Sequence, residues 1–405
     1  MFGRQEDRRL IFHVSQNDGR TIEELLTPRS PLDTPRTVGG AVVDATYVER
    51  DPALLARFAG AHVPWATDPM SRRFASPGYL SVASLASLPY APSTPLSLTA
   101  KSRELDRMIR RALEFQAVHE PAMYMVPSLP LPRVSTRALA VLQHTHEVAA
   151  QLNGSVGIPY RPMLATVYPG LSVMRGRYSV FERLSDRAFS GVYVQALQLN
   201  AKRDSLEKLV TYSEFLRHGR DAGFRVVAGR PGTFGLVLSA FGIDGFDSAL
   251  GDGESFSLAR LVKPRIAEAN KPRKGGRQRR IYFSGLMTVL GEDDSAAILS
   301  NQAVRAQLAC GIEECAYDVK NPLSDPRRHF FHARVSELEA LERLQTEQLR
   351  IHYVRQRLDE ARDAGRLVNR VWRAMGREEI DFSHLDRWLA VITRVATGVA
   401  VRSGE

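Results

Sequence analysis

Short apolar runs rich in β-branched residues alternate with longer amphipathic stretches along most of the chain. Parallel strands that are covered on both faces are apolar throughout, so we predict a buried strand at each run. The eight predicted strands are Ala41–Val48, Val63–Asp68, Met123–Leu129, Pro162–Tyr168, Ser190–Leu199, Phe224–Gly229, Ile243–Leu250 and Arg280–Leu286. The predicted helices between them are Pro52–Ala59, Arg103–Ala117, Thr136–Leu152, Tyr178–Asp186, Leu206–Ala222 and Phe234–Ala240.

Eight strands separated by helices are the pattern of a closed parallel (β/α)8 barrel. An open, doubly wound sheet uses the same units and is the alternative, but eight units match what a closed barrel requires. We therefore predict an α/β fold with a TIM-barrel domain at residues 39–300. Residues 1–38 are polar and proline-rich and are expected to form an irregular arm, and residues 301–405 are expected to form an added helical subdomain.

The composition narrows the class of protein. Hydrophobic residues make up 44% of the 405 residues, which supports a packed core and excludes a disordered chain. The formal net charge is +10, from 55 basic and 45 acidic residues, and only seven of the basic residues are Lys. Arginine pairs with phosphate and stacks on bases, so this charge favours an anionic partner such as nucleic acid. A GC-rich genome would produce the same arginine excess, and composition alone leaves both explanations open.

The pattern of apolar and cysteine residues indicates where the protein works. No apolar run approaches the roughly 18–20 residues of a membrane span, and the charged N-terminus MFGRQEDRRL lacks a signal-peptide core. Two cysteines in the chain exclude a disulfide scaffold. We expect a cytoplasmic protein without a membrane partner, and a homodimer is compatible with the sequence.

Aspartates at the ends of predicted strands are the first candidates for chemistry. Asp68 closes the run VPWATD, Asp44 lies within VVDATYV, and Asp244 and Asp247 bracket GIDGFDSAL. Catalytic residues of barrel enzymes lie at the carboxyl ends of the strands. Two facing carboxylates support a displacement at a sugar carbon, one as nucleophile and the other as proton carrier. The alternative for any single aspartate is a turn or capping role.

Two further patterns suggest binding sites. Cys310 and Cys315 are close enough in sequence to share a zinc ion, with His329, His332 or His352 as further ligands; two free thiols are the alternative. A basic segment follows the seventh predicted strand and could neutralise several phosphates, or could simply be a solvated loop. Its basic residues are Lys263, Arg265, Lys271, Arg273, Lys274, Arg277, Arg279 and Arg280.

The order of these features resembles the tRNA-guanine transglycosylase family, whose members are TIM barrels with an added zinc subdomain. The segment Gly242-Ile-Asp-Gly-Phe-Asp-Ser248 is similar to the family segment that carries the nucleophilic aspartate, which implies that role for Asp247. Thr67-Asp68 resembles the family's Thr-Asp, which implies that Asp68 is the acid and base. Cys310 and Cys315 resemble the first and third cysteines of the family's zinc motif, and His352 its histidine, which implies a structural Zn²⁺.

The same resemblance implies a base-binding pocket. The strands at residues 189–197 and 225–229 are similar to two family strands that line this pocket. The implied substrate-binding residues are Tyr168, Gln195, Ala196, Leu197, Ala228 and Gly229.

The resemblance predicts a nucleic-acid base-exchange enzyme. Such an enzyme replaces guanine in DNA or tRNA with a 7-deazaguanine-type base through a covalent Asp-glycosyl intermediate. Asp68 is followed by Pro-Met-Ser where the family has Ser-Gly-Gly, a departure that fits a divergent branch such as the DNA-modifying transglycosylases. A barrel that binds nucleic acid without catalysis and a barrel glycoside hydrolase are the alternatives.

Overall fold

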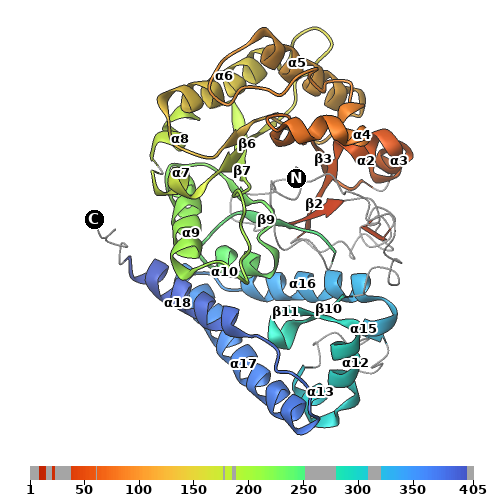
Figure 1. Ribbon diagram of the computed structural model, residues 1–405, viewed down its shortest axis with the longest axis vertical. Coiled ribbons are helices and arrows are strands. Elements are labelled where there is room, and N and C mark those ends of the chain that lie inside the picture. The colour runs from red at the N-terminus through yellow and green to blue at the C-terminus, as the bar shows by residue number, and fades with distance from the viewer. Residues whose placement is uncertain are drawn as a thin grey trace.

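A nearly closed ring of eight parallel strands forms the centre of the larger part of the molecule (Figure 1). The computed structural model describes residues 9–14, 21–22, 38–60, 62–176, 178–184, 188–250, 280–308 and 321–398. The strands of the ring are β1 (Arg9–Val14), β2 (Val38–Asp44), β3 (Trp65–Asp68), β4 (Tyr124–Met125), β6 (Met163–Pro169), β7 (Phe189–Val194), β8 (Val226–Ala228) and β9 (Gly245–Ser248).

The strand order confirms the predicted TIM-barrel fold. The strands follow one another as β3-β2-β1-β9-β8-β7-β6-β4, and β5 (Pro130–Leu131) also pairs with β6. The two ends of this order meet where the Ala122 N–H donates to the carbonyl of Trp65 over 2.9 Å. All pairings within the ring are parallel, so all the strands end at the same mouth of the barrel.

The start of the predicted barrel and its last predicted strand need correction. Of the first predicted strand, residues 41–44 lie in β2, whereas residues 45–48 lie in helix α2. Arg9–Val14, expected in an irregular arm, is β1 and lies between β2 and β9. The predicted eighth barrel strand lies outside the ring, because β10 (Arg280–Phe283) pairs in antiparallel fashion with β11 (Thr288–Gly291). The run RLIFHV has the apolar character of a barrel strand, but it is short and follows the charged sequence MFGRQED.

Amphipathic helices cover the outside of the ring, as Figure 1 shows. Serine N-caps define where several of them begin: the side chains of Ser102, Ser135 and Ser205 accept hydrogen bonds from backbone N–H groups three residues later. The helices of the barrel are α2 (Ala45–Arg50), α3 (Ala53–Gly60), α4 (Ala83–Ala86), α5 (Arg103–Val118), α6 (Thr136–Leu152), α7 (Leu171–Arg175), α8 (Tyr178–Arg183), α9 (Leu206–Asp221) and α10 (Gly235–Ala240).

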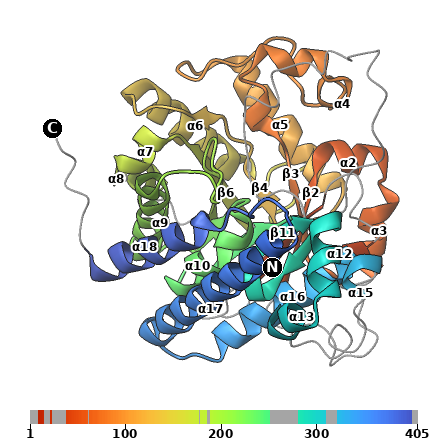
Figure 2. The same cartoon turned by 60° about the horizontal axis from the view of Figure 1, so that its bottom comes forward.

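The C-terminal helices pack along one side of the barrel and against the β10–β11 hairpin (Figures 1 and 2). A separate cluster around Ile281, Ile298 and Trp372 forms the core of this part. None of the helices in the described ranges combines the length and apolar character that a bilayer span requires. The helices are α12 (Glu292–Ser300), α13 (Gln302–Leu308), α15 (Asn321–Ser324), α16 (Pro326–Glu342), α17 (Glu347–Ala374) and α18 (Ser383–Thr397).

Helix α16 belongs to the outer layer of the barrel. Its Phe331 ring stacks on Phe12 of β1 with ring centroids 4.8 Å apart, and its Arg334 guanidinium lies 5.3 Å from the ring centroid of Phe246 in β9. The helix therefore covers β1 and β9, the position of the eighth helix in a (β/α)8 barrel. A helix that covers barrel strands thus lies within residues 301–405, the range predicted for the helical subdomain.

A buried polar network ties the hairpin to α16. Glu337 accepts hydrogen bonds from the hydroxyls of Tyr282 (2.8 Å) and Ser284 (2.6 Å), and from Arg334 Nη1 (2.6 Å). We expect Glu337→Ala to lower the free energy of unfolding by about 3–5 kcal/mol, because it removes the carboxylate that faces the buried Arg334. Glu339→Ala on the same helix should cost less than about 1 kcal/mol. Urea denaturation checks both values, and equal losses would contradict this account of the network.

Candidate active site

The inner face of the barrel changes from apolar to polar towards the mouth. The inward-facing side chains further from the mouth form an apolar cluster. It includes Ile11, Val42, Ala66, Tyr193 and Val227. Side chains in a strand alternate between its two faces, so the next inward positions lie two residues further along each strand. Five of these positions carry an ionisable or amide side chain, of which four are buried and Asp44 is 13% exposed. These residues are His13, Asp44, Asp68, Gln195 and Asp247.

His13 bridges two carboxylates at the mouth. Its Nδ1 lies 2.9 Å from Asp247 Oδ2, and its Nε2 lies 2.9 Å from Asp44 Oδ1. Asp247 Oδ2 also accepts a hydrogen bond of 2.7 Å from the Tyr193 hydroxyl, and Asp247 Oδ1 accepts one from the backbone N–H of Arg230. Asp247 is thus held in one orientation by groups from three other strand ends.

Charges within this network alter its ionisation. Burial and the nearby Arg230 lower the pKa of His13, but Asp44 and Asp247 outweigh them, so the pKa lies above its usual value. Burial alone would raise the pKa of Asp247, yet hydrogen bonding and charge from His13, together with Arg230, hold it below its usual value. The pKa of Asp44 is lowered by the charge and hydrogen bond of His13 despite burial. Asp247 is therefore an ionised carboxylate at neutral pH.

Asp68 is held by a different set of partners. Arg72 Nη1 lies 2.8 Å and 2.7 Å from its two carboxylate oxygens, and the backbone N–H of Met70 donates to Oδ1 over 2.8 Å. Arg72 is fully buried and lies 5.3 Å from the centroid of the Tyr168 ring. The two predicted carboxylates thus lie at one mouth, each with its own cationic neighbours.

Unusual backbone conformations occur beside both carboxylates. Met70 and Arg230 have positive φ angles of 53° and 52°, a region that non-glycine residues seldom adopt. The N–H groups of these two residues donate to Asp68 and Asp247. Backbone strain of this kind is concentrated at functional sites, where the surrounding structure holds it in place. At this mouth the two positive φ angles accompany backbone N–H groups that are aimed at the two carboxylates.

The predicted substrate-binding residues fall into two groups. The side chains of Tyr168 and Leu197 belong to the cluster inside the barrel, and the alternation places Gln195 and Gly229 on the inner face as well. The methyl groups of Ala196 and Ala228 pack outside the strands, among the core residues that the helices cover. Only the backbone of these two alanines could reach a ligand within the barrel.

Gly229 makes room for the side chain that orients Asp247. A Cβ atom at this position would lie 2.6 Å from Tyr193 Cζ and 2.8 Å from Gln195 Cβ. We expect Gly229→Ala to displace the Tyr193 ring and to lower the free energy of unfolding by about 1–3 kcal/mol. Gly60→Ala is the control, because no heavy atom lies within 4 Å of a Cβ built there. Thermal unfolding of both variants checks this, and an unchanged Gly229→Ala protein would contradict it.

Several functional groups of the mouth were missed by sequence reasoning. They are His13, Tyr193, Arg72, Arg73 and Arg230, and the role of Asp44 as a partner of His13 was also missed. One signal was available for His13, because in RLIFHV it lies two residues after Ile11 and so shares its face of a strand. Arg72 and Arg73 lie four and five residues after the predicted strand end at Asp68, in the loop region where barrel enzymes carry functional residues.

Of the three predicted zinc ligands, only His352 falls within the part of the chain that the structure describes. Cys310 and Cys315 are outside the described residues, and His352 is exposed on α17. The alternative ligand His329 is buried, with Nε2 2.7 Å from the carbonyl oxygen of Tyr282. The zinc site therefore stays a prediction.

His13, Asp44 and Asp68 form the one described group with the spacing of a metal site, since their ligand atoms lie within 4.8 Å of one another. Its surroundings do not fit a cation. Both nitrogens of His13 already face carboxylates, and both oxygens of Asp68 contact Arg72. Added positive charge from Arg230, 3.7 Å from Asp44, would repel a divalent ion.

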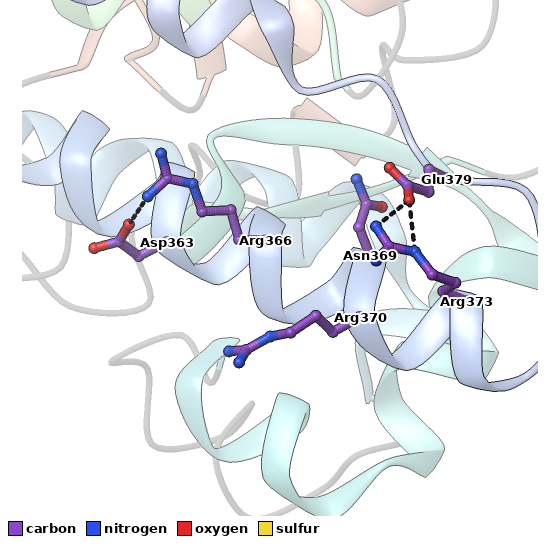
Figure 3. A pocket seen from close by; sticks show the side chains of 6 residues that line it. All are labelled: Asp363, Arg366, Asn369, Arg370, Arg373 and Glu379. Carbon is purple, nitrogen blue, oxygen red and sulfur yellow. Dashed lines mark hydrogen bonds and ion pairs between the residues drawn. The ribbon is translucent and has the colours of Figure 1, made fainter.

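Most of the predicted basic segment, from Lys263 to Arg279, lies outside the described residues, and Arg280 is exposed at the start of β10. A second basic surface lies on α17, where Arg366, Arg370 and Arg373 line a groove of about 550 Å³ (Figure 3). Within this groove, Arg366 pairs with Asp363 over 3.1 Å, and Arg373 pairs with Glu379. These pairs are exposed to solvent, where ion pairs contribute little.

Comparison with known proteins leaves the family open. No protein-family model matches the chain, and no curated protein matches it. A probable tagatose 6 phosphate kinase from Sinorhizobium meliloti is similar at 11% identity and a TM-score of 0.34, over 96% of this chain and 98% of that chain. A nitroalkane oxidase from Streptomyces ansochromogenes is similar at 13% identity and a TM-score of 0.28, over 96% and 97% of the two chains. At these identities and TM-scores, the two structures do not indicate what the site of this chain does.

Proposed function

We propose that the chain is a base-exchange enzyme that replaces guanine in DNA or tRNA with a 7-deazaguanine-type base. One observation carries this proposal: Asp247 and Asp68, the two carboxylates that the resemblance to tRNA-guanine transglycosylases implies, are both buried at the carboxyl ends of barrel strands. Asp244, the other aspartate of the same segment, lies before the start of β9 and accepts from the backbone N–H of Val226. The geometry thus favours Asp247 over Asp244 as the reacting group.

In the proposed reaction, a carboxylate oxygen of Asp247 forms a bond to C1′ of a nucleotide while the bond between C1′ and the base nitrogen breaks. The lowered pKa of Asp247 keeps this nucleophile ionised. His13 and Tyr193 contact Oδ2 of Asp247, and the Arg230 N–H donates to Oδ1. The oxygen that bonds to C1′ therefore gives up its hydrogen bonding, while the other oxygen keeps its own in the acylal that forms.

The exchange also requires a proton to move in each direction. The departing guanine gains a proton at its ring nitrogen, and the incoming base loses one when it attacks C1′, so charge balances over the cycle. Asp68 is the proposed carrier, and Arg72 and the Met70 N–H position its carboxyl group. His13 is the second proton-binding group of the site and touches the nucleophile directly.

Gln195 offers a group that could recognise the base. Its side chain is fully buried, and neither its amide oxygen nor its amide nitrogen has a hydrogen-bond partner among the described residues. A buried amide without partners costs free energy, which a ligand with a matching donor and acceptor would recover. The edge of a guanine-type base presents both kinds of group. We propose Gln195 as such a contact, and Cys310, Cys315 and His352 as ligands of a structural zinc ion.

The experiment is an exchange assay with radiolabelled guanine on three substrates: duplex DNA, bulk tRNA and a small aryl glycoside. We expect label to enter one of the two nucleic acids and no release of phenol from the glycoside. Binding of nucleic acid without exchange would contradict the proposal in favour of a binding protein. Hydrolysis of the glycoside without exchange would contradict it in favour of a glycoside hydrolase.

A further inference from the structure

Two further arginines, Arg73 and Arg230, lie among the charged groups of the mouth. Arg73 ends the short 3-10 helix η1 (Ser71–Arg73) after β3, and Arg230 follows β8. The Nε atom of each guanidinium is buried and has no hydrogen-bond partner among the described residues. Arg230 Nη2 contacts His13 and lies 3.7 Å from Asp44 Oδ1. The Arg230 side chain is 20% exposed, and an anionic ligand at the mouth would give these donors an acceptor.

The charges of the mouth point the same way. Asp68 faces Arg72, and Asp247 faces His13 and the backbone of Arg230. Asp44 is the third carboxylate of the mouth, and His13 already contacts it. Burial and, after it, repulsion from Arg72 and Arg230 lower the pKa of Arg73 to about 10. An added anion would relieve this repulsion.

We propose that Arg73 and Arg230 bind a phosphate group of the substrate beside Asp247. This inference rests on the proposed function and adds that the sugar under attack carries a phosphate. The backbone of Arg230 is tied to Asp247, while its side chain extends over the mouth. A phosphate bound by that guanidinium would therefore hold its sugar close to the carboxylate oxygen. Guanidinium groups suit this task because their planar N–H groups match phosphate oxygens in pairs.

The phosphate could come from a nucleic-acid backbone or from a free nucleotide. Both sources present the same oxygens to Arg73 and Arg230, so the structure identifies the shared chemistry. The arginines on α17 serve as a comparison, because Arg370 is exposed and lies in the groove of Figure 3, not at the barrel mouth. If phosphate bound to any exposed positive charge, Arg370 would contribute to binding as much as Arg73 and Arg230.

The first experiment measures binding of inorganic phosphate to the full chain by calorimetry. We expect saturable binding of one phosphate, a rise in Kd of about tenfold or more in Arg73→Gln and in Arg230→Gln, and no change in Arg370→Gln. Arg230→Lys should fall between these values, because it keeps the charge but loses the paired N–H groups. Thermal unfolding confirms that each variant is folded. Absence of saturable binding, or equal binding by the Arg73→Gln/Arg230→Gln double variant, would overturn the proposal.

Competition identifies the source of the phosphate. A short oligonucleotide and a nucleoside monophosphate are each titrated against bound inorganic phosphate, and the tighter competitor names the source; failure of both overturns the proposal. Base exchange is measured on the same proteins. If phosphate binding depends on Arg73 and Arg230 but the protein exchanges no base, the proposed function is rejected and the phosphate site is kept. If the Arg73→Gln/Arg230→Gln double variant exchanges bases with an unchanged KM, the phosphate site is rejected and the proposed base-exchange function is kept.

Discussion

Asp247→Asn is expected to lower the rate of base exchange by about 10⁴-fold or more, while the protein remains folded. An amide oxygen is a far weaker nucleophile than a carboxylate oxygen, so the covalent step has no substitute in this variant. The shape of the side chain is kept, and its one amide oxygen can still accept from either Tyr193 or the Arg230 N–H, which donate to different oxygens of Asp247. Exchange of labelled guanine, with thermal unfolding measured in parallel, checks this result.

Asp244→Asn is the matched control, because it makes the same chemical change three residues earlier in the same segment. Asp244 accepts a hydrogen bond from the backbone N–H of Val226, the first residue of β8, at the end of the strands away from the mouth. We expect its exchange rate to stay within a few-fold of wild type. Equal losses in both variants would indicate damage to β9, and full activity of Asp247→Asn would remove Asp247 from the reaction.

His13→Gln is expected to lower the free energy of unfolding by about 3 kcal/mol near pH 6. The imidazole lies 2.9 Å from Asp247 and 2.9 Å from Asp44, and its loss leaves two buried carboxylates without the cation between them. Urea denaturation measures the loss. His62→Gln is the control, because His62 is exposed, and it should change the stability by less than about 0.5 kcal/mol.

The loss in His13→Gln should also depend on pH. The pKa of His13 is raised in the folded protein above its usual 6.5, so its contribution is fully present below pH 6.5 and is lost as the pH rises through the folded value. The pKa of Asp247 is lowered below 3.8, so its contribution is present above that pH and is lost as the pH falls further. The difference between wild type and variant should therefore shrink above pH 6.5. A difference that grows with pH would contradict the proposed charge on His13.

Much of the barrel could be predicted because buried parallel strands are apolar along their whole length. Predicted runs such as Val63–Asp68 and Pro162–Tyr168 overlap β3 and β6 closely. Apolar character indicates burial, however, and does not say which sheet a strand joins. Ile281 and Phe283 are as buried as barrel residues, yet they belong to the core of the hairpin. Arg9–Val14 joins the ring through pairing partners that are distant in sequence.

The site was predictable only where a residue marks a strand end. Asp68 and Asp247 met that condition, because a carboxylate after an apolar run is costly to bury without a purpose. His13 was lost with its strand, and the contact between His13 and Asp44 depends on the pairing of β1 with β2. Arg72, Arg73 and Arg230 are few among many arginines, and only the tertiary structure shows which arginines lie near the carboxylates of the mouth.

The most direct test of the central claim is mass spectrometry of the reacting enzyme. The full chain is mixed with its nucleic-acid substrate without an incoming base, quenched in acid and digested with protease. We predict a nucleotide adduct on the peptide that contains Asp247, and its absence from Asp247→Asn. An adduct on any other residue, or exchange that proceeds with no adduct at any time point, would contradict the assignment of Asp247 as the nucleophile.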